Sequence, residues 1–163
     1  MSLYIHLSIH FLLAVLVGYL CGRIFKQVRL GIIVGILGGF LIDLDHVLEY
    51  FLFFGPTFNF QYFIESRQFL LSEKIRLYFH AWEYVPILLL LAWFFRSQQK
   101  LKLIFITLAF SGMIHLVSDI FINNYYFRYY SITYRYQRDF SASKLLSPEQ
   151  YQLNLDYKKE LGI

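Results

Sequence analysis

Residues 30–54 read LGIIVGILGGFLIDLDHVLEYFLFF, a long apolar stretch interrupted only by Asp43, Asp45, His46 and Glu49. About 20 predominantly apolar residues in a helix cross the hydrocarbon core of a bilayer. Backbone groups in lipid must be hydrogen-bonded within their own segment, so this stretch is predicted to be a helix. Comparable apolar runs occupy residues 3–22, 80–95 and 101–122. Together the four runs predict an all-α fold, an integral membrane four-helix bundle.

The composition also favours a membrane protein. Of the 163 residues, 58% are hydrophobic and 21% are aromatic, whereas soluble domains are about half apolar. A single cysteine, Cys21, excludes an intramolecular disulfide and a cysteine-based zinc site. The net charge of +4 comes from scattered residues, which suits anionic lipid head groups and provides no basic face for nucleic acid. Membrane lipids are therefore expected partners and nucleic acid is not, while the oligomeric state stays open.

Two short connections, residues 23–29 and 96–102, each carry three basic residues. By the positive-inside rule, both connections face the cytoplasm. The predicted location is the cytoplasmic (inner) membrane, crossed several times, with the 55–79 connection and the C-terminal tail on the extracytoplasmic side.

Glycines recur in the first half of the second run. Gly31, Gly35 and Gly39 form two overlapping G-x-x-x-G spacings. Small residues at this spacing let two membrane helices approach closely. No strand precedes these glycines, which argues against a dinucleotide-binding fingerprint.

The chain divides into a membrane domain, residues 1–122, and a tail, residues 123–163. Within the first, residues 56–79 mix Phe and Leu with Glu, Lys and Arg, a pattern that predicts an amphipathic helix lying at the membrane interface. The tail begins with a tyrosine-rich stretch, residues 125–136, which is interpreted as an aromatic belt or alternatively as a head-group-binding surface. Further on, Ser147-Pro148-Glu149-Gln150 has the form of a capping box and predicts a short C-terminal helix.

All five histidines and several carboxylates fall at one end of the four runs. Counted from the basic connections, they lie 13–17 residues along each run, which is about 20–26 Å at helical rise. Four helices thus place polar groups at one depth, in the outer third of the bilayer. Ionisable residues in membrane helices are costly and usually functional. The paired spacings, i,i+3 and i,i+4, put each pair on one helix face.

Imidazole and carboxylate groups from facing helices are the composition of a metal site. A divalent metal is therefore predicted, zinc first and manganese or iron as alternatives, with one to three ions. The predicted ligands are His6, His10, Asp43, His46, His80, His115 and Asp119. A purely structural hydrogen-bonded network is the alternative, although a buried carboxylate layer without cations is expensive.

Two more carboxylates are candidates for a catalytic part. Asp45 or Glu83 would act as general base if neither binds the metal. In a regular helix Asp45 points away from Asp43 and His46. Either the helix is distorted at residues 43–46, or Asp45 supports a ligand from behind.

At these residues the chain resembles the YdjM-like family of LexA-regulated, inner-membrane metal-dependent hydrolases. The resemblance covers residues 1–122 and rests on an early histidine (His10, with His6 as the alternative), Asp43-Leu44-Asp45-His46, His80, and His115-Leu116-Val117-Ser118-Asp119. That family is similar to zinc-dependent phospholipase C and P1-type nucleases, which implies hydrolysis of a phosphodiester or phosphomonoester and carries an H-x-x-x-D pair onto His115 and Asp119. The chain departs from the family pattern at Ile42, where proline is common, and around His80, where a second histidine is common.

The sequence therefore predicts a membrane-embedded metal-dependent hydrolase in which metal-activated water attacks a phosphoester of a lipid or lipid-linked substrate. Three alternatives stay open. A metal or proton transporter would need polar groups along the whole path, and here the cytoplasmic half of each run is apolar. A bis-histidine haem protein would place carboxylates beside the porphyrin. A non-catalytic membrane scaffold would use metal for stability alone.

Overall fold

A computed structural model describes residues 3–163 as helices joined by short connections, and no strand occurs in that range. The all-α prediction is thereby confirmed. In chain order the elements are α1 (Leu3–Ile24), α2 (Val28–Leu41), α3 (Leu44–Phe54), α4 (Phe60–Ile64), α5 (Arg67–Ser72), α6 (Tyr84–Phe94), α7 (Gln99–Asn123), η1 (Phe127–Tyr130), α8 (Ile132–Tyr136), α9 (Ala142–Leu145) and α10 (Pro148–Glu160).

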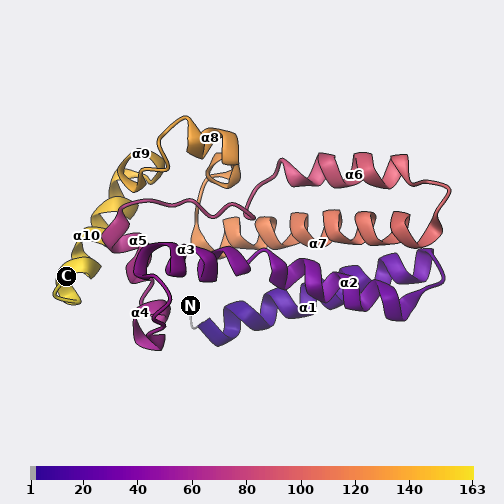
Figure 1. Cartoon of the computed structure of the whole chain (residues 1–163), viewed down its shortest axis with the longest axis horizontal. Coiled ribbons are helices and arrows are strands. Elements are labelled where there is room, and N and C mark those ends of the chain that lie inside the picture. The colour runs from indigo at the N-terminus through magenta and orange to yellow at the C-terminus, as the bar shows by residue number, and fades with distance from the viewer. Residues whose placement is uncertain (1–2) are drawn as a thin grey trace.

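Helices α1, α2 and α7 pack against one another, and α6 lies along α7 (Figure 1). The α1–α2 contact is made backbone to backbone. A Cβ on Gly35 would overlap the carbonyl oxygen of Ala14 and the backbone of Gly18. Across the bundle, the hydroxyl of Ser111 donates to the Gly35 carbonyl at 2.7 Å. The close packing predicted from the glycine spacing is therefore confirmed.

Among the described residues, three stretches are long and apolar enough to cross a membrane: Tyr4–Ile24, Val28–Phe54 and Gln99–Asn123. The fourth predicted span, residues 80–95, contains only the 11-residue helix α6, which is about 16 Å long. Its helix begins at Tyr84 because residues 79–82 bond elsewhere: the amides of Phe79 and His80 donate to Asp45, and that of Trp82 donates to the Tyr130 carbonyl. The four-helix count is thus not confirmed, and α6 stands beside three spans of full length.

The second span is broken where its acidic residues begin. Helix α2 ends at Leu41 and α3 starts at Leu44, and the amides of Asp43 and His46 bond to carbonyls three residues back, at 3.1 Å each. Such tight bonds change the helix rotation locally. The distortion expected as one alternative at residues 43–46 is present.

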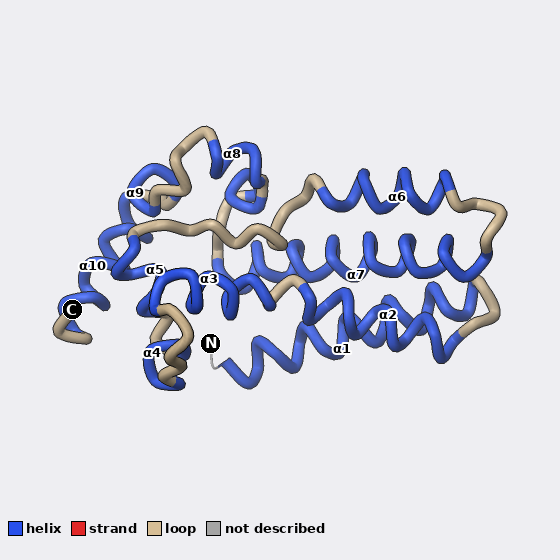
Figure 2. The backbone as a smooth tube through the Cα atoms, in the orientation of Figure 1, coloured by secondary structure: helices blue, strands red, loops and turns tan. Residues whose placement is uncertain are grey.

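Residues 55–83 and 124–163 form the cap region, which covers the end of the bundle opposite the two basic connections (Figure 2). The single interfacial helix predicted over 56–79 is instead two short helices, α4 and α5, separated at Ser66, whose φ is 55°. The chain then runs without helix from Glu73 to Glu83. The capping box predicted at Ser147 and Gln150 is confirmed at the start of α10.

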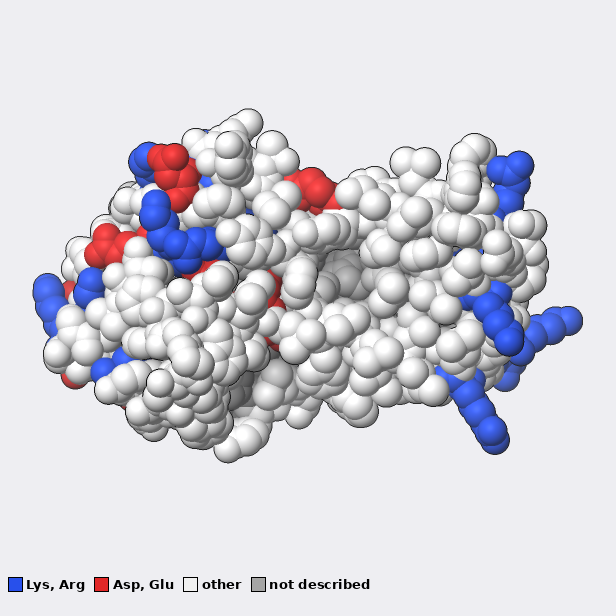
Figure 3. Space-filling model, viewed as in Figure 1, with Lys and Arg blue, Asp and Glu red and all other residues white. Residues whose placement is uncertain are grey.

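An apolar core ties the cap region to α7. It consists of Ile75, Leu77, Leu116, Tyr129, Tyr130, Ala142, Leu145 and Leu146. Lys and Arg side chains gather at the end of the molecule that holds the α1–α2 and α6–α7 connections, and the other charges lie on the cap region, with an almost uncharged surface between them (Figure 3). This distribution is consistent with a membrane protein.

Candidate metal centre

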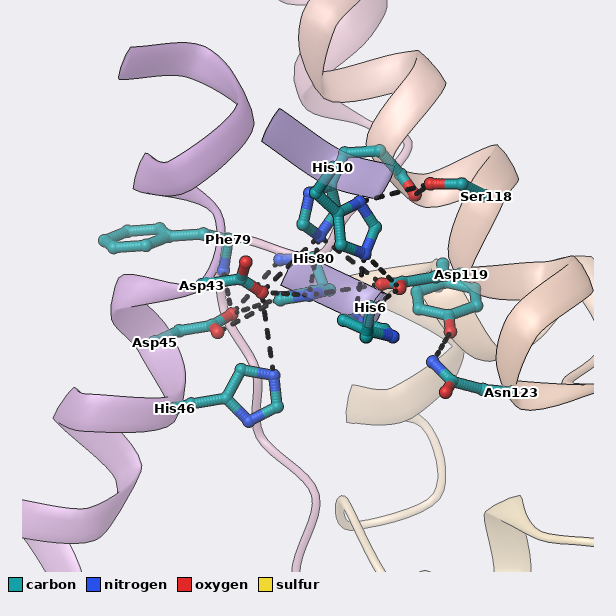
Figure 4. A network of polar contacts seen from close by, with 12 residues as sticks. His6, His10, Asp43, Asp45, His46, Phe79, His80, Ser118, Asp119 and Asn123 are labelled. Atoms are coloured by element: carbon teal, nitrogen blue, oxygen red, sulfur yellow. Dashed lines mark hydrogen bonds and ion pairs between the residues drawn. The ribbon is translucent and has the colours of Figure 1, made fainter. Parts of the chain in front are cut away.

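The structure brings together all seven side chains that the sequence predicts as ligands, in three overlapping groups (Figure 4). They come from four places in the chain: His6 and His10 on α1, Asp43 and His46 at the α2–α3 break, His80 in the segment before α6, and His115 and Asp119 on α7. Most are buried. His6, Asp43 and His46 keep 22%, 23% and 36% of their side chains exposed, so the cluster is reached from their side.

Four atoms form the inner group: His80 Nε2, His115 Nε2, Asp43 Oδ1 and Asp119 Oδ2. The two nitrogens are 3.4 Å apart. Asp43 Oδ1 is 3.5 Å from each nitrogen, and Asp119 Oδ2 is 3.4 Å from each. A tetrahedral zinc ion with ligands at 2.0–2.1 Å separates those ligands by about 3.3–3.4 Å. Five of the six edges of such a tetrahedron therefore have the required length.

Asp119 also serves a second group through its other oxygen. Its Oδ1 lies 3.1 Å from His10 Nε2 and 3.5 Å from His6 Nε2. The His10 ring stacks on His115, with centroids 3.9 Å apart. A third group joins His46 to Asp43 and His80, with His46 Nε2 4.0 Å from Asp43 Oδ1. Shared carboxylates of this kind are how proteins place metal ions side by side.

The residues fit a divalent cation. Within the described residues, Asp43, Asp45 and Asp119 form ion pairs with histidines and with no Lys or Arg. Asp43 Oδ2 is buried and has no hydrogen-bond partner. Burial lowers the pKa of His80, but hydrogen bonds to Asp119, Asp43 and Asp45 outweigh it and raise that pKa well above its ordinary value. Carboxylates gathered this closely favour a positive charge among them.

Asp45 lies behind the His80 ring and not in the inner group. It is 1% exposed, accepts from the amides of Phe79 and His80 at 2.9 and 3.2 Å, and faces His80 Nδ1 at 3.0 Å. When Nδ1 carries the proton and donates to Asp45, Nε2 offers its lone pair to the cluster. A carboxylate in this place orients a histidine ligand. The structure thus places Asp45 where the supporting alternative expects it.

Ser118 supports His10 as Asp45 supports His80, by bonding to Nδ1 so that Nε2 faces the cluster. The sequence did not predict this role. Its hydroxyl donates to the His115 carbonyl at 2.8 Å and lies 3.2 Å from His10 Nδ1. A hydroxyl has one proton to donate. Oγ therefore accepts from His10 Nδ1, and His10 Nε2 presents its lone pair toward Asp119 Oδ1 and His6 Nε2, which lie 3.1 and 2.8 Å away.

Glu83, the other predicted catalytic carboxylate, is engaged by the tail. It accepts from Ser131 Oγ at 2.6 Å and from the amides of Ile132 and Thr133 at 3.2 and 3.1 Å. Burial raises the pKa of Glu83, but these hydrogen bonds prevail and hold that pKa below its ordinary value. These contacts make Glu83 a cap for the start of α8. Its carboxylate oxygens bond to residues of the tail and to none of the seven predicted ligands.

Arg135 is a further contributor that the sequence analysis took for part of an aromatic belt. It is fully buried, and its Nη2 donates to the His80 carbonyl at 2.7 Å. Nearby, the Ile75 amide bonds to the Phe140 carbonyl at 2.8 Å. The segment that carries His80 is thus fixed by Asp45 on one side and by the tail on the other. The position of Arg135 between Tyr134 and Tyr136 was the one signal in the sequence that set it apart.

A cavity of about 360 Å³ reaches the cluster from the cap region, and His46, His80 and Asp119 form part of its wall. Tyr125, Tyr129, Tyr130 and Asn154 line it from the tail. The centre therefore adjoins a space with both hydroxyl and amide groups. No family model, curated protein or solved structure matches this chain, so the family resemblance stays a prediction that rests on the short motifs.

Proposed function

We propose that this protein is a membrane-embedded, metal-dependent hydrolase that acts on a phosphoester of a lipid or lipid-linked substrate. The observation that carries the proposal is the inner group, in which the His80 and His115 nitrogens lie 3.4 Å apart and each is 3.4–3.5 Å from an Asp43 oxygen and an Asp119 oxygen. Its donor set suits zinc first, with manganese or iron as alternatives. One to three ions are proposed, and Asp119 would be shared between neighbouring ions through its two oxygens.

A divalent ion held there would lower the pKa of a bound water and polarise a phosphoryl oxygen, which is the chemistry that phosphoester hydrolysis requires. The protein's own residues supply the rest. Asp45 and Ser118 fix the donor nitrogens of His80 and His10, and the buried side of the cluster excludes water. The partly exposed side chains of His6, Asp43 and His46 leave one face from which a substrate group can approach.

Two features favour this function over the alternatives. A bis-histidine haem site is disfavoured because carboxylate oxygens occupy the space between the two histidines. Asp43 and Asp119 oxygens lie 3.4–3.5 Å from the His80 and His115 nitrogens, where a porphyrin plane would have to pass. For transport, the half of the bundle away from the cluster is closed by direct packing of α1, α2 and α7, with Leu103 and Thr107 fully buried between them. Within the described residues, the polar cavity that reaches the cluster is lined from the cap region and not from that half of the bundle.

The location belongs to the same proposal. The cluster residues of α1, α7 and the α2–α3 break lie at the ends of those helices that are remote from the two basic connections (Figure 1). If those connections face the cytoplasm, the centre faces the extracytoplasmic side of the inner membrane, in the outer third of the bilayer. The substrate's phosphoester would meet the metal centre there without leaving the membrane.

The first test is metal content of detergent-purified protein by elemental analysis. Wild type is compared with His115→Ala and Asp43→Ala, and with Asp156→Asn as a control on the exposed face of α10. We expect one or more equivalents of metal in wild type and control, and a loss in both cluster variants.

The second test is release of phosphate or of a phosphorylated head group from a long-chain phosphomonoester and a phospholipid. Folded wild type that takes up no added zinc, manganese or iron would overturn the proposal.

A further inference from the structure

A second hollow of about 360 Å³ lies among the apolar helices, between α6 and α2 and over α7. Figure 3 shows the surface hollowed beside α6. The floor is made of small residues, Gly38, Ala109 and Gly112, and the walls include Leu88 and Leu108. Of the described side chains that line it, Tyr84 alone carries a polar group. We call it the α6 groove.

The α6 groove exists because α6 and α2 both pack on α7 while the residues between them are small. The floor is open at Gly112, where an added Cβ would meet only the end of the Ile42 side chain, at 3.3 Å. Ala109 is 1% exposed, while Leu90, on another face of α6, is 63% exposed. The groove is therefore a shaped feature, distinct from the outward face of the same helix.

One end of the groove adjoins the metal centre. Three of its lining residues are chain neighbours of inner-group ligands: Ile42 precedes Asp43, Phe79 precedes His80, and Leu116 follows His115. Figure 4 shows Phe79 beside Asp43 and Asp45. The polar cavity of the cap region shares His80 itself. The cluster thus stands between a polar space and an apolar one.

The groove runs along α2 and α7, which belong to stretches long and apolar enough to cross a membrane. In a bilayer, hydrocarbon chains would therefore surround it. We propose that the α6 groove holds one acyl chain of the lipid substrate while the phosphoester of that lipid lies at the metal centre. This inference rests on the proposed function and narrows its substrate to phosphoesters that carry a long hydrocarbon chain.

The groove would act by orientation more than by affinity. An acyl chain that moves from the bilayer into the groove gains almost no hydrophobic free energy, because lipid is as apolar as the groove. What the chain gains is a fixed position relative to the metal centre, and correct placement of a reacting group accelerates its reaction strongly. The signature is therefore a rate advantage for long-chain substrates that depends on the shape of the groove.

The matched variants are Leu88→Trp, which fills the groove, and Leu90→Trp, which puts the same side chain on the exposed face of α6. Hydrolysis is measured for phosphomonoesters with a short, water-soluble chain and with a long chain. We expect Leu88→Trp to lower kcat/KM for the long chain by about tenfold or more and to leave the short chain unchanged. Leu90→Trp should change neither. Equal effects of Leu88→Trp on both chain lengths would overturn the proposal.

Photocrosslinking separates this inference from the proposed function, because it needs no turnover. The probe is phosphatidic acid with a diazirine on one acyl chain, added to the metal-loaded wild type in lipid nanodiscs. We expect labelling to concentrate on residues 85–88 and 108–112, and to fall in Leu88→Trp only.

Even labelling of all exposed helix faces would show contact with bulk lipid and refute the groove, whatever the hydrolysis result. Groove labelling without hydrolysis of any substrate would refute the proposed enzyme and hence the inference that rests on it. A dimer that dissociates in Leu88→Trp would assign the groove to a second copy instead.

Discussion

The two oxygens of the Asp45 carboxylate lie 3.0 and 3.1 Å from Nδ1 of His80, on the side of the ring that faces away from the cluster. The same carboxylate also accepts the backbone amide of His80 at 3.2 Å. Asp45 therefore holds both the ring and the main chain of one candidate ligand. This relationship explains why Asp45 is buried although it lies outside the inner group.

Asp45→Asn should weaken metal binding without removing a ligand. The Asn carbonyl oxygen can keep the place of Oδ2 and accept from the amides of Phe79 and His80. The substitution removes the negative charge and the second acceptor oxygen, which favour a proton on His80 Nδ1 and so leave Nε2 unprotonated. Loss of such a supporting carboxylate typically costs about 10–100-fold in metal affinity. Competition with a chromogenic chelator measures it, and Asp156→Asn is the control. Unchanged affinity in a folded Asp45→Asn protein would contradict the assigned role.

Arg135→Met should loosen the metal centre from the tail side. The substitution removes the 2.7 Å hydrogen bond to the His80 carbonyl at a cost of about 1–3 kcal/mol. We expect a lower unfolding midpoint and also faster loss of metal to a chelator, measured well below that midpoint. Arg138→Met is the control, because Arg138 stacks on the Tyr134 ring in the same segment. A drop in stability with normal metal retention would mean that Arg135 supports only the fold.

Glu83 should contribute stability that depends on pH. Its hydrogen bonds from the Ser131 region hold its folded-state pKa below the unfolded value, which is about 4.3. The contribution is therefore fully present above that unfolded value and is lost as the pH falls through the folded pKa. Thermal unfolding of wild type and Glu83→Gln is compared at pH 7 and at pH 4, and the difference between their unfolding midpoints should be smaller at pH 4. A difference of the same size at both pH values would contradict a stabilising role for the ionised carboxylate.

Gly35→Ala should destabilise the α1–α2 pair. The added Cβ overlaps the Ala14 carbonyl and the Gly18 backbone, which cannot move aside as a flexible side chain would. Overpacking of this kind costs about 1–3 kcal/mol. Gly112→Ala is the matched control, because its Cβ meets only the end of the Ile42 side chain. Unfolding in mixed detergent micelles would compare the two, and equal stability of both variants would refute the backbone contact.

The sequence predicted the placement of the cluster well because helical geometry is local. Polar residues at equal distances from basic anchors must lie at similar depth once the helices stand side by side. His10, Asp43, His115 and Asp119 meet for that reason. The glycine spacing likewise predicts which faces of α1 and α2 touch, since only residues without side chains permit that approach.

The rest depends on contacts between distant parts of the chain. The segment from Glu73 to Glu83 is apolar enough to suggest the start of a helix, yet its backbone bonds to Asp45, Tyr130 and Phe140. Nothing within that segment encodes those partners. Arg135 could be read as a surface cation for the same reason, because its acceptor lies 55 residues away in sequence. Short-range patterns cannot reveal such pairs.

The attachment of His80 to the tail sets an order of maturation. The chain leaves the ribosome from its N-terminus, so α1, α2, α3 and α7 are all synthesised before Arg135 and Tyr130 exist. Until the tail folds back, the segment that carries His80 is held by Asp45 alone and lacks its hydrogen bonds to Arg135 and Tyr130. A newly made protein would therefore complete its candidate metal centre only at the last stage of assembly. An incomplete chain in the membrane would lack the full centre, and with it the proposed hydrolysis of the surrounding lipids.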